Sequence, residues 1–151
     1  MANTTFTGPV ISTNGFVGAV IGNVTGNIAN PTFTHTPEAI NATATATAAQ
    51  VATGYIKSTS AAATTITLPT GTLLGAALGA VQGTVFDLYI DNTAGASTVT
   101  IAVAVNGILS ALAAAEAGGS GLLTIPAGVT GQAQFTLMFS SATAYTFSRV
   151  A

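Results

Sequence analysis

The chain has 151 residues and a mass of 14.7 kDa, which is enough for one domain and a short additional segment. Only 4% of the residues are charged and the formal net charge is −2, so no basic surface for DNA or RNA can be assembled. Cysteine is absent, which excludes disulfides, thiolate metal sites and thiol nucleophiles. The mean hydropathy of +0.65 argues against a disordered, charge-rich chain and predicts that most of it folds.

The positive mean hydropathy raises the question of a membrane span. The longest apolar segment, residues 101–117, contains Asn106, Gly107 and Glu116 and has no cationic or tryptophan flank, so it is predicted not to cross a bilayer. The first residues form neither the basic nor the apolar part of a secretory signal. We therefore expect synthesis in a cytoplasm and no membrane partner.

The sequence changes in character near residue 50. Residues 1–50 are rich in Gly, Asn and Thr with isolated hydrophobic side chains, whereas residues 51–151 show the two-residue alternation typical of half-buried strands. This difference predicts an extended N-terminal arm over 1–50 and a β domain over 51–151. Residues 41–49, which are almost entirely Ala and Thr, are interpreted as an edge strand or a tether.

Three tetrads between residues 18 and 29 repeat glycine in the first place and Val or Ile in the third. Four residues are too few to fold alone, so Val20, Val24 and Ile28 can be buried only against another copy or another protein. A flexible linker is the alternative, because Gly-rich polar segments commonly have that role.

The β domain is predicted to contain strands with one apolar face. Their ranges, with the inward side chains, are 64–68 (Ile66, Leu68), 84–92 (Phe86, Leu88, Ile90), 97–105 (Val99, Ile101, Val103, Val105), 132–139 (Phe135, Leu137, Phe139) and 144–150 (Tyr145, Phe147). The strands at 84–92 and 97–105 are expected to pair as a hairpin, and Asn106-Gly107 is expected to form a type I′ turn. Residues 111–117 are interpreted as strand and turn.

One short helix is expected between the first two of these strands. Thr72 is expected to cap it and Ala80 to end it, with Leu74, Leu78 and Val81 on its apolar side. The predicted fold class is therefore all-β, a small antiparallel β-sandwich or barrel with one short helix, preceded by the extended arm.

Few side chains could perform acid–base or metal chemistry. Apart from hydroxyl groups they are His35, Glu38, Lys57, Asp87, Asp91, Glu116 and Arg149. His35 is the only histidine and precedes Pro37, so it is interpreted as a solvated loop residue; Lys57 is interpreted as a solvated cation. The Gly-x-Ser-x-Gly, Gly-x-Gly-x-x-Gly and P-loop patterns do not occur.

Asp87 and Asp91 fall on one face of a predicted strand, about 13 Å apart at ~3.3 Å per residue, which is too far for a retaining glycosidase pair. We therefore predict no catalytic, metal or cofactor site and do not expect an enzyme. An ion pair of Asp87 or Asp91 with Arg149, between strands or between subunits, is a candidate use of these charges. The alternative is an exposed, weakly coupled arginine.

Several segments resemble a family of viral proteins. Residues 5–16, Thr-Phe-Thr-Gly-Pro-Val-Ile-Ser-Thr-Asn-Gly-Phe, and the tetrads after them resemble the N-terminal part of tailed-bacteriophage virion proteins. The second half is similar to small phage capsid decoration (cement) and head-fibre proteins over residues 49–50, 54–56, 63–70, 86–93 and 97–101. The resemblance implies a homotrimer on the outer surface of the virion capsid, made in the host cytoplasm, whose arm contacts the major capsid protein.

The arm residues expected to contact the capsid are its large apolar side chains, Phe6, Val10, Phe16, Val20, Val24 and Ile28. The alternative function is a head-fibre or tail-associated adhesion module that binds host carbohydrate. For that function the sequence offers no tryptophan, and only Tyr89 or Tyr145 is expected to stack on a sugar ring. A secreted surface-array protein is a third class, and it would require an export signal.

Overall fold

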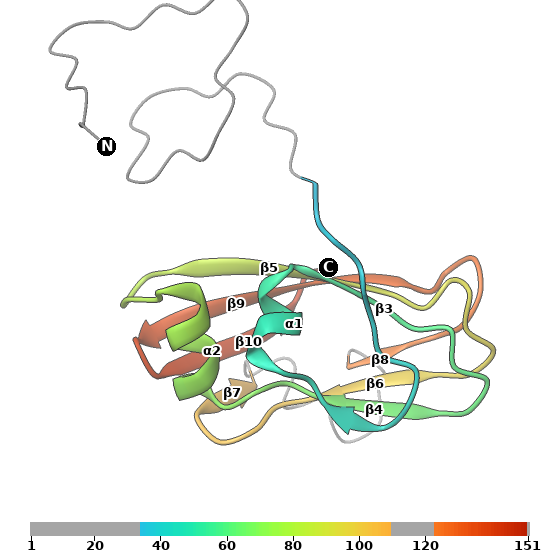
Figure 1. Cartoon of the computed structure of the whole chain (residues 1–151), viewed down its shortest axis with the longest axis horizontal. Coiled ribbons are helices and arrows are strands. Elements are labelled where there is room, and N and C mark those ends of the chain that lie inside the picture. Colours follow the sequence, from blue (N-terminus) through green and yellow to red (C-terminus); the bar gives the residue numbers. More distant parts are fainter. Residues whose placement is uncertain (1–33, 110–122, 151) are drawn as a thin grey trace, which may run out of the picture. The chain divides into compact units, whose positions relative to one another are not determined.

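The structure, a computed structural model, describes residues 34–109 and 123–150. Contacts divide the chain into two units, Met1–Thr32 and Phe33–Ala151, and all described residues belong to the second. These residues form two mixed sheets and two short helices (Figure 1). The predicted β class is confirmed, whereas the purely antiparallel arrangement and the single helix are wrong.

Sheet A has six strands in the order β1-β3-β5-β9-β10-β7. Their bounds are β1 (Glu38–Ala39), β3 (Tyr55–Lys57), β5 (Val85–Asp91), β7 (Gly107–Leu109), β9 (Gln132–Ser141) and β10 (Ala144–Arg149). The strands β1, β3 and β5 run parallel, β9 runs antiparallel to β5 and β10, and β7 runs parallel to β10.

Sheet B has four strands in the order β2-β4-β6-β8. Their bounds are β2 (Ala44–Thr45), β4 (Thr64–Thr67), β6 (Val99–Ala102) and β8 (Thr124–Ile125). The strands β2, β4 and β6 run parallel, and β8 runs antiparallel to β6. Each sheet therefore combines parallel and antiparallel pairs.

Between β1 and β6 the chain passes three times from sheet A to sheet B. We call each pair of successive strands, β1 with β2, β3 with β4 and β5 with β6, a passage. The first strand of a passage lies in sheet A and the second in sheet B, so the strands of successive passages run parallel in both sheets. Ile56 pairs with Ile90 in sheet A, and Ile66 pairs with Ile101 in sheet B. The hairpin predicted from residues 84–92 and 97–105 is wrong, because the loop between them carries the chain from one sheet to the other.

Two helices return the chain from sheet B to sheet A. In α1 (Ala48–Ala52) the Thr47 hydroxyl oxygen accepts from the Gln50 N–H, and the Gln50 side chain accepts from the Thr47 N–H, which forms a capping box. The second helix, α2 (Gly71–Leu78), is capped by Thr70 rather than Thr72 and ends at Gly79 in the left-handed conformation. Figure 1 shows the two helices beside the sheets.

Residues 38–50, which the sequence placed in the arm, contribute β1, β2 and part of α1 to the folded unit. Within residues 41–49 the predicted edge strand is confirmed for Ala44–Thr45, which is β2 at the edge of sheet B, whereas residues 48–49 begin α1. Residues 1–33 of the predicted arm lie outside the described residues.

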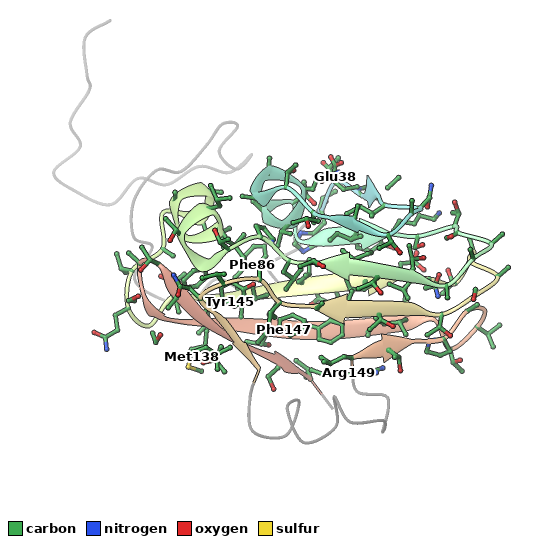
Figure 2. The ribbon with its side chains drawn as sticks, turned by 90° about the horizontal axis from the view of Figure 1, so that it is seen from below. Glu38, Phe86, Met138, Tyr145, Phe147 and Arg149 are labelled. Atoms are coloured by element: carbon green, nitrogen blue, oxygen red, sulfur yellow. The ribbon has the colours of Figure 1, made fainter. Side chains whose placement is uncertain are left out.

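Both sheets contribute to one hydrophobic core. Its fully buried large side chains on the strands include Ile56, Leu88, Ile90, Phe135, Leu137, Phe139, Tyr145 and Phe147 in sheet A, and Ile66, Ile101 and Ile125 in sheet B. The rings of Phe135 and Phe147 stack with centroids 4.7 Å apart. Figure 2 shows Tyr145 and Phe147 between the layers. The inward faces predicted for 64–68, 132–139 and 144–150 are confirmed.

Five predicted core positions are buried less than expected. Leu78, Phe86 and Val103 are only partly buried. Val105 is 72% exposed because it lies in the turn after β6, beyond the end of the strand, and Val81 is 63% exposed because α2 ends before it. The predicted strand and helix extended too far in both cases.

The turn after β6 is not of type I′. Asn106 has a φ of 63°, and the N–H of Gly107 donates to the carbonyl of Ala104 at 2.9 Å. A type I′ turn requires two residues with positive φ, whereas here only Asn106 has one. The turn delivers the chain to β7 at the far edge of sheet A. Residues 111–117 lie outside the described residues, so their interpretation stays a prediction.

A buried asparagine joins the two sheets at one end. The side chain of Asn92 is completely buried, and its Nδ2 donates to the carbonyl oxygens of Ser97 (2.9 Å), Ile125 (3.1 Å) and Pro126 (3.0 Å). These carbonyls belong to the loop after β5 and to the end of β8. A Cβ on Gly95 would lie 2.0 Å from Asn92 Oδ1, so this approach requires glycine.

Helix α2 packs directly on the backbone of the turn between β9 and β10. A Cβ on Gly71 would lie 2.2 Å from the carbonyl oxygen of Thr143, and a Cβ on Gly75 would lie 1.9 Å from that of Ala142. The two glycines are one helical turn apart and share a face. Their missing side chains allow the close approach.

Candidate functional site

The outer face of sheet A carries a hollow at one end, which we call the tyrosine hollow. Its volume is about 220 Å³, and it is lined by Tyr55, Tyr89, Ile90, Asp91, Gln132, Ala133 and Gln134. These residues come from β3, β5 and β9, three adjacent strands of the sheet. The hollow therefore lies on the hydrogen-bonded framework of the sheet rather than on loops alone.

Strand register brings the polar lining together. Tyr89 pairs with Tyr55 on one side and with Gln134 on the other, which makes one row across three strands. Asp91 pairs with Lys57 and Gln132 in the next row, two residues along each strand. Residues two apart on a strand share a face, so both rows point outward.

Asp91 is the best-connected side chain in the hollow. Its Oδ2 accepts from the Tyr55 hydroxyl at 2.7 Å, and its Oδ1 accepts from the N–H and the hydroxyl of Thr93 at 2.9 and 2.6 Å. Burial by itself would raise the pKa of Asp91, but the hydrogen bonds from Thr93 and Tyr55 and the charge of Lys57 outweigh burial and lower it. The same hydrogen bond, with burial, raises the pKa of Tyr55, so its hydroxyl remains a donor at neutral pH.

Tyr55→Phe is expected to reduce the loss of stability on acidification. Because the pKa of Asp91 is lowered in the folded state, its stabilising effect is present above the unfolded pKa of about 3.9 and is lost as the pH falls through the folded pKa. Removing the Tyr55 hydroxyl brings the two pKa values closer. Urea unfolding at neutral pH and at about pH 3 should show a smaller difference for the variant than for the wild-type protein.

The control for this substitution is Tyr89→Phe, because the Tyr89 hydroxyl makes no hydrogen bond within residues 34–109 and 123–150. That variant should keep the wild-type acid response. An unchanged acid response in Tyr55→Phe would show that the bond to Asp91 does not set the pKa of the carboxyl group.

The remaining polar groups of the hollow are available to a ligand. In the described part of the chain, the side chains of Tyr89, Gln132 and Gln134 make no hydrogen bond with protein groups. His35 lies beside them, with its ring centroid 5.7 Å from that of Tyr89. Its Nδ1 lies 2.9 Å from the Thr53 carbonyl oxygen, which only accepts, so this nitrogen carries the proton. His35 lies in a loop, as predicted, but its ring is half-buried against Tyr89 rather than solvated.

The opposite end of the same face carries a line of exposed side chains that we call the apolar row. Val85 pairs with Met138, Met138 with Thr146, and Thr146 with Ile108. Val85, Met138 and Ile108 are 56%, 55% and 56% exposed. Figure 2 shows Met138 at the periphery of the sheet, away from Tyr145 and Phe147. The face thus combines a polar end and an apolar end.

The structure gives the predicted ion-pair residues other partners. Asp87 Oδ1 accepts from the Thr136 hydroxyl at 2.9 Å on the outer face. Arg149 pairs in register with buried Phe135, lies over its ring at 6.0 Å and donates to the Thr124 carbonyl at 3.2 Å. Asp87 and Arg149 therefore lie on opposite faces of sheet A. A pair between subunits stays a prediction.

Tyr145, one of the two tyrosines considered for sugar stacking, is not on the surface. It is completely buried, and its hydroxyl donates to the Pro69 carbonyl at 3.0 Å. Burial raises its pKa to about 12. Tyr89 is instead accompanied by Tyr55, Gln132 and Gln134, which the sequence analysis did not single out. Their alternation with apolar neighbours places them outward, but only the register between strands brings them together.

The residues expected to contact a capsid, Phe6 to Ile28, lie outside the described residues. Within the described residues no group of three or more His, Asp or Glu side chains could hold a metal ion. None of the helices described is long and apolar enough to cross a membrane. Comparisons with protein-family models, with curated proteins and with solved structures find no match to this chain.

Proposed function

We propose that the chain is a non-enzymatic virion structural protein, a capsid decoration protein. It binds the outside of a phage head as a homotrimer, and its N-terminal segment contacts the major capsid protein. The observation that carries the proposal is the apolar row, in which three large side chains of one sheet face are more than half exposed. Because the row contains no charged group, the free-energy cost of removing water from it is small when another protein covers it.

The composition supports the same conclusion. With 4% charged residues, contacts between copies or with a capsid bury few ions that would need partners. The tetrads at residues 18–29 supply further apolar side chains, Val20, Val24 and Ile28, at a regular spacing. A protein that binds the assembled head but not its separate subunits stabilises the head by mass action. This requires no catalytic group.

The purified chain is expected to form a trimer of about three times 14.7 kDa, which light scattering during size exclusion measures directly. Val85→Asp, which places a charge in the apolar row, should shift the mass toward the monomer. Val129→Asp is the matched control, because Val129 is 100% exposed in the turn before β9, at the other end of the face.

A trimer that Val85→Asp dissociates and Val129→Asp leaves intact supports the row as the contact between copies. Equal masses for the wild-type chain and both variants would show that the apolar row does not form the contact between copies. The direct test of the function is co-sedimentation of the wild-type chain with expanded, DNA-free heads of the phage that encodes it. Saturable binding is expected, and its absence would overturn the proposal.

A further inference from the structure

We infer that the tyrosine hollow is a binding site for a neutral saccharide. The inference does not rest on the proposed function, because it concerns the other end of the face and applies to the isolated chain.

Two tyrosines from neighbouring strands line the hollow. Tyr55 and Tyr89 are direct partners on parallel strands, and such neighbours lie about 4.8 Å apart. The Tyr55 ring is fixed at its far end by the hydrogen bond to Asp91, and the Tyr89 ring rests against His35. Aromatic rings supply broad apolar contact at low entropic cost, which suits the C–H face of a pyranose.

Hydrogen-bonding groups surround these rings. The Gln134 amide flanks Tyr89 in the same row, and Gln132 flanks Asp91 in the next. Each amide offers both donors and an acceptor, and Asp91 keeps acceptor capacity beyond the bonds from Tyr55 and Thr93. Vicinal sugar hydroxyls, which both donate and accept, match this mixture of groups.

The charge of the hollow favours a neutral ligand. Asp91 is the one charged residue among those that line the hollow, and the charge of its register partner Lys57, which lies outside the lining, partly offsets it. The carboxylate is already bound by three protein donors, which further reduces its attraction for a metal ion. A hollow of about 220 Å³ leaves room for one sugar ring.

The backbone that carries these groups is fixed before a ligand arrives. Strand β5 lies inside sheet A, bonded on one side to β3 and on the other to β9, and all three strands contribute to the hollow. A Cβ on Gly54, which precedes Tyr55, would lie 2.6 Å from the His35 ring, so the segment carrying His35 packs tightly beside the site. Preorganisation of this kind reduces the entropic cost of binding.

The experiment titrates the full ¹⁵N-labelled chain with methyl glycosides of glucose, galactose, mannose, N-acetylglucosamine and N-acetylgalactosamine and follows amide chemical shifts. At least one glycoside should shift the amides of Tyr89 and Gln134 saturably, with a dissociation constant on the order of 1 mM. Failure of all five to do so would overturn the inference. So would tighter binding of glucuronate than of methyl glucoside, because the site would then select charge.

Variants test the assigned roles. Tyr89→Ala and Gln134→Ala should each weaken binding by about tenfold. Tyr89→Phe keeps the ring and should retain most of the affinity. Met138→Ala is the matched control on β9, because it lies on the same face at the other end, and it should bind as the wild-type chain does. A Tyr89→Ala variant that keeps a dispersed spectrum and full affinity would show that the sugar binds elsewhere.

Discussion

Replacing Asn92 with aspartate is expected to lower the free energy of unfolding by about 3–5 kcal/mol. The Nδ2 group donates to three carbonyl oxygens at 2.9 to 3.1 Å in a completely buried position. A carboxylate has no N–H to offer, so its oxygens would face these carbonyls, and a negative charge would be buried. Protonation of the new carboxyl group would restore only one donor.

Urea unfolding followed by circular dichroism measures this effect. The matched control is Asn41→Asp, because Asn41 uses its oxygen instead, accepting from the N–H and the hydroxyl of Thr59 at 2.7 and 3.1 Å in an exposed loop. An aspartate preserves both bonds, so the control should change stability by no more than about 0.5 kcal/mol. Equal losses in the two variants would mean that the Asn92 amide does not hold the sheets together.

Gly75→Ala is expected to destabilise the fold by about 2–3 kcal/mol, although alanine is the better helix former by about 1 kcal/mol. The new methyl group would lie 1.9 Å from the Ala142 carbonyl oxygen, which belongs to the backbone and cannot rotate aside. Either α2 must move away from the turn between β9 and β10, or the turn must move. Both movements loosen the packing of Leu74, which is completely buried on the same helix.

The urea midpoint compares this variant with Thr72→Ala, an exposed position of the same helix. That control gains helix propensity without a clash and should differ from the wild-type chain by at most about 0.5 kcal/mol. If Gly75→Ala were as stable as the control, the helix would have room to shift, and the close approach to the turn would not limit stability.

Local patterns in the sequence predicted which side chains point inward, because alternation in a strand depends only on near neighbours. Ile66, Phe135, Leu137 and Phe147 are buried as expected. Strand pairing depends on segments that are distant in the sequence. The alternation in residues 84–92 and 97–105 is compatible with a hairpin and equally with the observed arrangement, in which the two strands lie in different sheets. In the structure the loop between them connects sheet A to sheet B, and the hydrogen bonds of the buried Asn92 side chain stabilise this connection.

Helix α1 and the tyrosine hollow illustrate two different reasons for an incomplete prediction. The alternating Ala and Thr of residues 42–48 favoured an extended structure, yet Thr47 and Gln50 have the spacing of a capping box, so the helix had a readable signal. The hollow had none of comparable strength. Its tyrosines and glutamines are separated by up to 79 positions along the chain and meet only through the registers of β3, β5 and β9.

The stacked passages also determine how this architecture can evolve. Successive passages pair with one another, the third also pairs with β9 and β8, and the first, β1 with β2, lies at one edge of both sheets. Duplication of a passage at that edge would lengthen both sheets together and leave β3, β5 and β9 in their present registers. Descendants of such a chain could differ in size while the outer face of sheet A keeps its arrangement.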